Sequence, residues 1–205
     1  MAVSIAEKTG YPFAFDIELS IQTEREVKFP LRLRVPGWSG EPAVVAAGAT
    51  VTRDERGFLV VSKQWKTGDK VRLTLKPAIH GRTAVNGTTA VAYGPLVCSL
   101  PIPEKAEITR PFPAAEAAGL KGFYGYQYDP VDLVSAKRLL TLQPGKPGFG
   151  FSVVEDNDTD PQHPWDRSPL KLRGEMIGAN GKPETVELLP MGCTILRRTF
   201  FPVVK

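Results

Sequence analysis

The 205-residue chain has 42% hydrophobic and 23% charged residues and a formal net charge of +4. A chain of this length and polarity can bury its own core, and it has no apolar run that could span a membrane and no secretory leader pattern at its N-terminus. Its basic residues are scattered singly, which argues against a nucleic-acid-binding face. Nineteen glycines and nineteen prolines favour many short strands and turns.

The first half of the chain alternates apolar and polar residues in short runs. In residues 15–21 the apolar side chains have one parity and Asp16, Glu18 and Ser20 have the other, which predicts a strand with one solvated face. Residues 31–35 repeat the pattern, with Arg32 and Arg34 outward. Further strands are expected at residues 43–47, 58–62, 71–75, 89–93 and 96–100. Turn residues separate them at the short spacing typical of a β-sandwich.

The second half opens with a proline-rich stretch, which we interpret as a linker followed by a short helical turn at residues 114–120. Strands are then expected at residues 122–128, 138–143, 149–155, 170–178, 185–190 and 195–203. The fold class predicted from these patterns is all-β, an antiparallel, jelly-roll-like sandwich or two small sandwiches, with little helix. We expect a sandwich domain over residues 1–104 and a second β-rich part over 105–205, whose last strand, about 193–205, returns to the first sandwich.

Metal chemistry has weak support in the sequence. Asp156, Asp158 and Asp160 have the alternating spacing of a calcium loop, but Pro161 and Arg167 stand where an EF-hand needs Gly and Glu. A solvated loop is the favoured interpretation, and a looser calcium site is the alternative. His80 and His163 lack partners at zinc-ligand spacing, so we expect no metal site.

Covalent and acid–base chemistry have no distinctive pattern either. Cys193 has no base near it in the sequence, and Asp132, Glu155 and Glu184 could serve glycoside hydrolysis only if two of them met across a cleft. We therefore expect no catalytic or cofactor-binding residue in this chain. Two interpretations of Cys98 and Cys193 stay open, buried thiols or a disulfide.

Aromatic residues give the one candidate binding site. Tyr124, Tyr126 and Tyr128 share a parity and would line one face of a strand, where a row of rings could stack on sugars. The alternative is that the row packs under a neighbouring loop or domain. Trp38 and Trp65 sit beside turns, and for them we favour a role in the core over sugar binding.

Five segments in order resemble a known family. These are TGYPF (9–13), LRLRVPGW (31–38), GFLVVSKQWKTGDKVRLTL (57–75), AVAYGPLVCSL (90–100) and LLPMGCTILRRTFFP (188–202). From about residue 9 to residue 202 the chain resembles the C-terminal β-sandwich region of glycoside hydrolase family 127 (GH127), the β-L-arabinofuranosidase-like family. The resemblance implies a β-sandwich fold and a role in carbohydrate degradation.

The resemblance also implies where the chemistry of the family resides. In GH127 an N-terminal (α/α)6 barrel holds a cysteine nucleophile, a zinc ion and the general acid/base, and no position here matches those motifs. Zinc is therefore expected only in the barrel, and the chain alone is expected to be inactive. The implied partner is the catalytic barrel, with subunit contacts and a homodimer as further expectations. The compartment stays open between the bacterial cytoplasm and, if a leader lies upstream, the periplasm or exterior.

Two other functions stay open from the sequence. One is a free-standing carbohydrate-binding module that holds a plant or bacterial polysaccharide through the tyrosine row. The other is a small hydrolase with its own active site.

Overall fold

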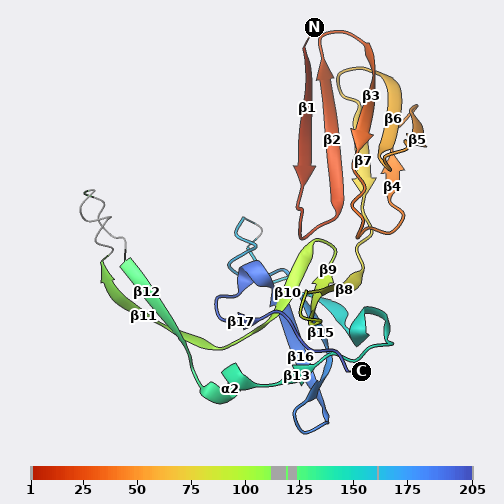
Figure 1. Ribbon diagram of the computed structural model, residues 1–205. Helices are drawn as coiled ribbons and strands as arrows, with labels where there is room; N and C mark the ends of the chain where they lie inside the picture. The colour runs from red at the N-terminus through yellow and green to blue at the C-terminus, as the bar shows by residue number, and fades with distance from the viewer. Residues whose placement is uncertain (1, 112–118, 120–123, 161, 205) are drawn as a thin grey trace. The chain divides into compact units, whose positions relative to one another are not determined.

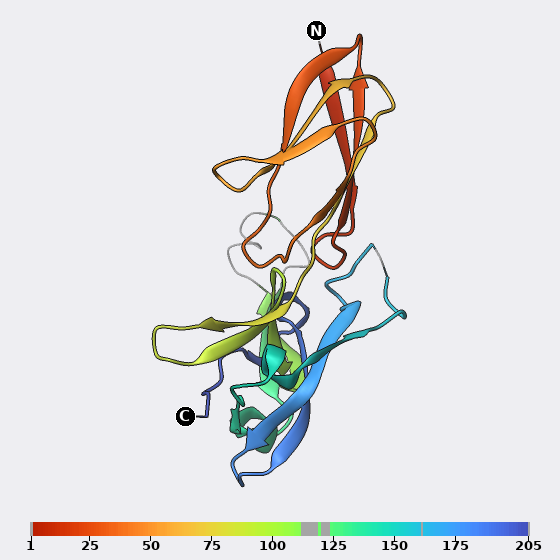
Figure 2. The same ribbon diagram turned by 90° about the vertical axis from the view of Figure 1, so that its right-hand side faces the viewer.

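The computed structural model describes residues 2–111, 119, 124–160 and 162–204. They form two compact units, unit 1 over residues 1–80 with 93–96 and unit 2 over 81–92 with 97–205 (Figures 1 and 2). The named strands pair antiparallel throughout the described part, and the helices are short, so the all-β prediction is confirmed. The expected boundary near residue 104 and the return of the last strand stay predictions.

Unit 1 is a sandwich of two antiparallel sheets with an apolar core between them. The first sheet has the order β1-β2-β7-β4 and the second β3-β6-β5. Their strands are β1 (Val3–Thr9), β2 (Asp16–Thr23), β3 (Val27–Leu33), β4 (Ala43–Val45), β5 (Thr50–Arg53), β6 (Leu59–Trp65) and β7 (Lys70–Thr74). The alternation read from the sequence is confirmed in β2, where Leu19 and Ile21 are buried.

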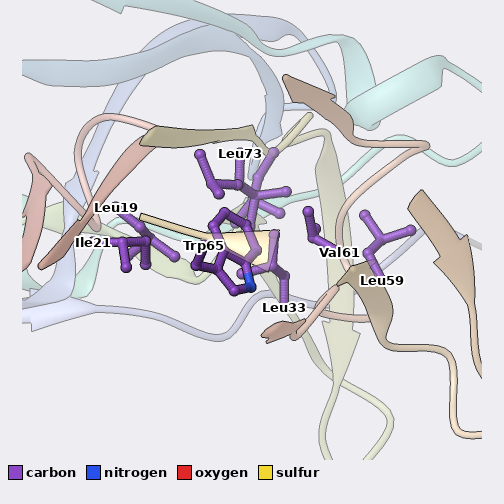
Figure 3. Close-up of a cluster of buried hydrophobic side chains, with 9 residues drawn as sticks. Leu19, Ile21, Leu33, Leu59, Val61, Trp65 and Leu73 are labelled. Carbon is purple, nitrogen blue, oxygen red and sulfur yellow. The ribbon is translucent and has the colours of Figure 1, made fainter. Parts of the chain in front are cut away.

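Trp65 lies at the centre of this core (Figure 3). Its side chain is fully buried, and the indole Nε1 donates a hydrogen bond of 2.9 Å to the carbonyl oxygen of Phe29. A buried indole needs such an acceptor because its N–H would otherwise lose the hydrogen bond that water provides. Trp38 packs against the same core from its edge, with its ring 5.8 Å from that of Phe15. The predicted core role of both tryptophans is confirmed.

Unit 2 is built on an antiparallel sheet with the order β13-β15-β16-β10-β9-β8, to which β14 and β17 add as partners of β15 and β10. Its centre is the long pair β15 and β16, drawn in blue in Figure 2, which buries Leu172, Met176 and Leu188. The strands are β8 (Ile79–Thr83), β9 (Thr89–Tyr93), β10 (Leu96–Pro101), β13 (Leu140–Thr141), β14 (Ser152–Glu155), β15 (Leu170–Gly178), β16 (Pro183–Pro190) and β17 (Arg197–Arg198).

The C-terminal residues add to this sheet in short contacts. Arg197 and Arg198 of β17 pair with Pro101 and Leu100, and Phe201 exchanges two backbone hydrogen bonds with Thr89. Two 3₁₀ turns, η1 (Pro147–Gly150) and η2 (Met191–Cys193), lie between strands. The chain end is thereby fixed to strands from earlier in the sequence.

A separate two-stranded ribbon stands where a linker was expected. The proline-rich stretch before residue 114 was expected to be a linker, but β11 (Glu104–Pro111) is a strand that pairs with β12 (Tyr124–Pro130). The expectation was wrong because β11 carries few apolar residues, and its pairing partner supplies the order that its own sequence does not signal. The helical turn expected at 114–120 falls largely outside the described residues. A short helix, α2 (Leu133–Lys137), follows β12 and was not predicted.

Candidate functional site

A pair of tyrosines lies on one face of the β11–β12 ribbon. The rings of Tyr126 and Tyr128 are 6.2 Å apart between centroids and inclined by 27°, as expected for side chains two residues apart on a strand. Tyr126 is 56% exposed and Tyr128 is half-buried. Tyr124 lies on the same strand with the same parity, but its side chain is outside the described part. The structure thus brings two of the three predicted tyrosines together.

The opposite face of the ribbon is polar. Gln127 donates a hydrogen bond of 2.8 Å to Asp129, and Lys105 lies 3.6 Å from Glu107 on the facing strand. The register places Lys105 opposite Asp129 and Glu107 opposite Gln127. Because charges gather on one face and aromatic rings on the other, the ribbon has two chemically distinct surfaces.

A second surface feature surrounds α2. Four large apolar side chains within nine residues are exposed there, and we call them the α2 patch: Val131 (62% exposed), Leu133 (65%), Val134 (82%) and Leu139 (67%). No signal in the sequence analysis pointed to it, since residues 131–139 are too few for a helical period to be recognised.

Polar contacts hold α2 in place. Asp132 caps the helix by accepting hydrogen bonds from the backbone N–H of Ser135 at 2.6 Å and from its hydroxyl at 2.8 Å, and these bonds lower the pKa of the Asp132 carboxyl. At the other end the guanidinium of Arg198 donates to the carbonyl oxygens of Ala136, at 2.9 Å, and of Arg138.

Arg138 ties the same segment to β16. Its Nε and Nη2 both donate to Oε2 of Glu184, at 2.9 and 2.6 Å. Beside this ion pair is an open depression of about 530 Å³ lined by Leu133, Val134, Leu139 and Ala179, with Lys137 and Asn180 at its polar side. One wall of the depression is therefore apolar, and beside it lie the Arg138–Glu184 ion pair and the ammonium group of Lys137.

Three aspartates of the acidic loop bind side chains of the same loop. Arg167 donates to Asp158 at 2.8 Å and to Asp156 at 3.2 Å, and His163 lies 2.7 Å from Asp160. The pKa of Asp156 is lowered, first by the backbone N–H of Asp158 and then by Arg167, and the pKa of Asp160 is lowered first by His163. No cluster of metal-ligating side chains is found among the described residues. These carboxylates therefore already have partners within the loop.

Two of the three carboxylates considered for glycoside hydrolysis, Glu155 and Glu184, do not form a pair. Asp132 caps α2 and Glu184 binds Arg138, while Glu155 faces Leu170 at the far end of β15. Glu184 faces Met176 on that strand, six residues from Leu170, so Glu155 and Glu184 are about 20 Å apart along the sheet. That spacing exceeds the roughly 5–10 Å of a glycosidase pair.

The cysteines are thiols with no disulfide between them. Cys98 is fully buried, and Cys193 is half-buried with its Sγ 3.8 Å from the carbonyl oxygen of Pro164. Burial raises the pKa of the Cys193 thiol, which disfavours the thiolate that a nucleophile needs.

His80 is held by a 3.2 Å contact between Nδ1 and the Ala78 carbonyl oxygen. In the described ranges, none of the helices combines the length and apolar character of a membrane span.

The fold and the sites define an all-β region with a sandwich core and exposed apolar and aromatic surfaces. Residues 1–77 match the family model described as beta-L-arabinofuranosidase, GH127 middle domain. The resemblance to GH127 proteins is therefore confirmed, and it is carried at the level of sequence by residues 1–77.

Solved structures share the fold of nearly the whole chain. A GH127 beta-L-arabinofuranosidase from Geobacillus stearothermophilus T6 has 18% identity and a TM-score of 0.59, and the match covers 98% of this chain and 31% of that one. A GH127 beta-arabinofuranosidase has 20% identity and a TM-score of 0.60, with 98% and 32% covered. A structure named glycoside hydrolase has 16% identity and a TM-score of 0.61, with 99% and 32% covered.

The chain spans about a third of the length of these structures. A search of curated proteins gave no match.

Proposed function

We propose that this chain is the non-catalytic β-sandwich region of a GH127-like glycoside hydrolase, which supports a catalytic (α/α)6 barrel and contributes subunit contacts in carbohydrate degradation. The observation that carries the proposal is the match of residues 1–77 to the GH127 middle domain. The chain spans about a third of the matched glycoside hydrolases, which leaves most of each of those proteins outside the matched region.

The candidate chemistry of the chain supports a non-catalytic role. Glu155 and Glu184 are too far apart to act together, and the pKa of the Cys193 thiol is raised. In this proposal the two units stabilise the barrel, and their exposed surfaces contact it. The zinc and the nucleophile of the reaction belong, in this proposal, to the barrel.

Hydrolysis of an aryl β-L-arabinofuranoside by the purified 205-residue chain tests the catalytic part of this proposal. We expect no release of the aryl group above the buffer rate, with or without added Zn²⁺. Turnover that is lost in a Cys193→Ala variant, while Cys98→Ala keeps it, would show that the chain has its own active site and would contradict the proposal.

A second candidate function is carbohydrate binding by the tyrosine row. It is supported by the exposure of Tyr126 and by the near-parallel rings of Tyr126 and Tyr128, because sugar rings stack on accessible aromatic faces. The ligand would be a plant or bacterial polysaccharide. In this alternative the chain binds its ligand without the barrel.

Affinity electrophoresis in gels that contain arabinan or other plant polysaccharides tests this alternative. If the row binds sugar, the chain is retarded and Tyr126→Ala removes the retardation. Tyr11→Ala is the matched control, because Tyr11 is also exposed (45%) but lies in unit 1. Equal migration of the wild-type chain in gels with and without polysaccharide would eliminate sugar binding.

A further inference from the structure

The α2 patch presents apolar side chains to solvent from a segment that is firmly held. A helix of five residues is not stable alone, and here the Asp132 cap, the Arg198 guanidinium and the Arg138–Glu184 ion pair fix it. These contacts are polar and lie at the ends of the helix and on its side toward β16. The helix thus reverses the usual arrangement of an amphipathic helix on a protein surface, in which apolar side chains pack inward.

Exposed apolar residues are ordinary when they stand singly, but a group of them marks an interaction surface. Val131, Leu133, Val134 and Leu139 lie within nine residues, and each has more than 60% of its surface exposed. Three of them also line the depression of about 530 Å³ beside α2. The α2 patch therefore has protruding apolar side chains, and the depression beside it can receive side chains of a partner.

The charges around the depression define the chemistry of that partner. Arg138 and Glu184 neutralise each other, whereas Lys137 forms no ion pair with the described residues. A complementary surface would carry apolar side chains with one carboxylate opposite Lys137. A polysaccharide fits less well, because exposed Leu and Val side chains provide no flat aromatic face for stacking.

We propose that the α2 patch is the docking surface for the catalytic barrel, which presents apolar side chains and a carboxylate to Lys137. The proposal rests on the proposed function, in which a barrel is the partner. That occupant is favoured because the solved GH127 structures match nearly all of this chain with about a third of their own length, so each joins such a region to a larger body of protein.

Amine footprinting measures whether Lys137 is covered in the native protein. The protein is precipitated from its source cells with an antibody against this chain and acylated briefly, and the labelling of Lys137 is quantified by mass spectrometry beside that of the isolated chain. Lys66 and Lys28 are the controls, because both are exposed and lie in unit 1. We expect labelling of Lys137 to fall at least tenfold in the native protein, relative to these controls.

The outcomes separate this proposal from the proposed function. If barrel sequences are present and Lys137 reacts as fast as in the isolated chain, the docking surface is wrong and the proposed function stands. If no barrel sequences are present, the proposed function fails. Protection of Lys137 that grows with the concentration of the isolated chain would instead identify a second copy as the occupant and overturn the proposal.

A variant connects the protection to the apolar side chains. Val134→Asp in the native protein should return Lys137 to at least half of its labelling in the isolated chain, whereas Val85→Asp should leave the protection unchanged. Both valines are highly exposed, at 82% and 110%, so neither substitution should unfold unit 2. Unchanged melting temperatures of the two isolated variants verify this, and continued protection in Val134→Asp would overturn the proposal.

Discussion

Trp65 shows how one residue organises unit 1. It packs between the two sheets, and its N–H is satisfied by Phe29, so its removal leaves both a cavity and a carbonyl group without its partner. Trp65→Ala should lower the free energy of unfolding of unit 1 by about 3–5 kcal/mol. Urea unfolding followed by circular dichroism measures the loss. Trp38→Ala, at a half-buried site, should cost clearly less, and equal losses would contradict the assigned core.

Asp69 gives unit 1 a dependence on pH. Its carboxylate accepts hydrogen bonds from Lys63 at 2.7 Å and from the backbone N–H of Lys66 at 2.9 Å, and these lower its pKa from the ordinary 3.8, with Lys63 the larger cause. A carboxyl whose folded pKa is lowered stabilises the fold above its unfolded pKa and loses that contribution as the pH falls through the folded pKa.

The difference in unfolding free energy between the wild-type chain and Asp69→Asn should therefore shrink between about pH 5 and pH 2. Urea unfolding at a series of pH values measures it. Glu55→Gln is a control at an exposed position in the same unit. A difference that stays constant, or that grows toward low pH, would show that Asp69 is not held as described.

At the scale of elements, the junction of β14 and β15 depends on the absence of a side chain at Gly174. A Cβ atom there would lie 2.7 Å from Cδ1 of Phe151 and 3.0 Å from its Cα, so a methyl group would displace the backbone that leads into β14. We expect Gly174→Ala to destabilise unit 2 by about 1–3 kcal/mol. Thermal unfolding measures the effect, and Gly37→Ala, where a Cβ meets no atom within 4 Å, is the control. Equal melting temperatures for the two variants would contradict this packing.

The elements also show what a sequence can and cannot reveal. The bounds of β15 agree with the predicted strand at 170–178, because nine residues of apolar and polar alternation carry the signal within the strand itself. β11 was missed because its pairing with β12, and not its composition, makes it a strand. α2 was missed because Arg198, 60 residues beyond Arg138, supplies part of its support.

The same distinction applies to the candidate sites. The shared face of Tyr126 and Tyr128 follows from strand parity, which is a local property. The α2 patch depends on which side of a short helix faces β16, and no local pattern sets that orientation. The separation of Glu155 from Glu184 likewise follows from strand register, which the sequence does not display.

For the whole molecule, the proposed function makes the chain a supporting region of a larger glycoside hydrolase. The two units supply a β scaffold, and the exposed α2 patch is the proposed docking surface for the barrel. Within unit 2, strand register keeps Glu155 and Glu184 too far apart to act as a glycosidase pair. Under the proposed function, catalysis requires the barrel.

Purification of the native protein from its source cells, with an antibody against this chain, tests the proposed function most directly. We expect mass spectrometry to find the sequence of an (α/α)6 barrel with this chain, in one polypeptide or in one complex, and we expect the preparation to hydrolyse a β-L-arabinofuranoside. Recovery of the 22.4 kDa chain without any barrel sequence would contradict it.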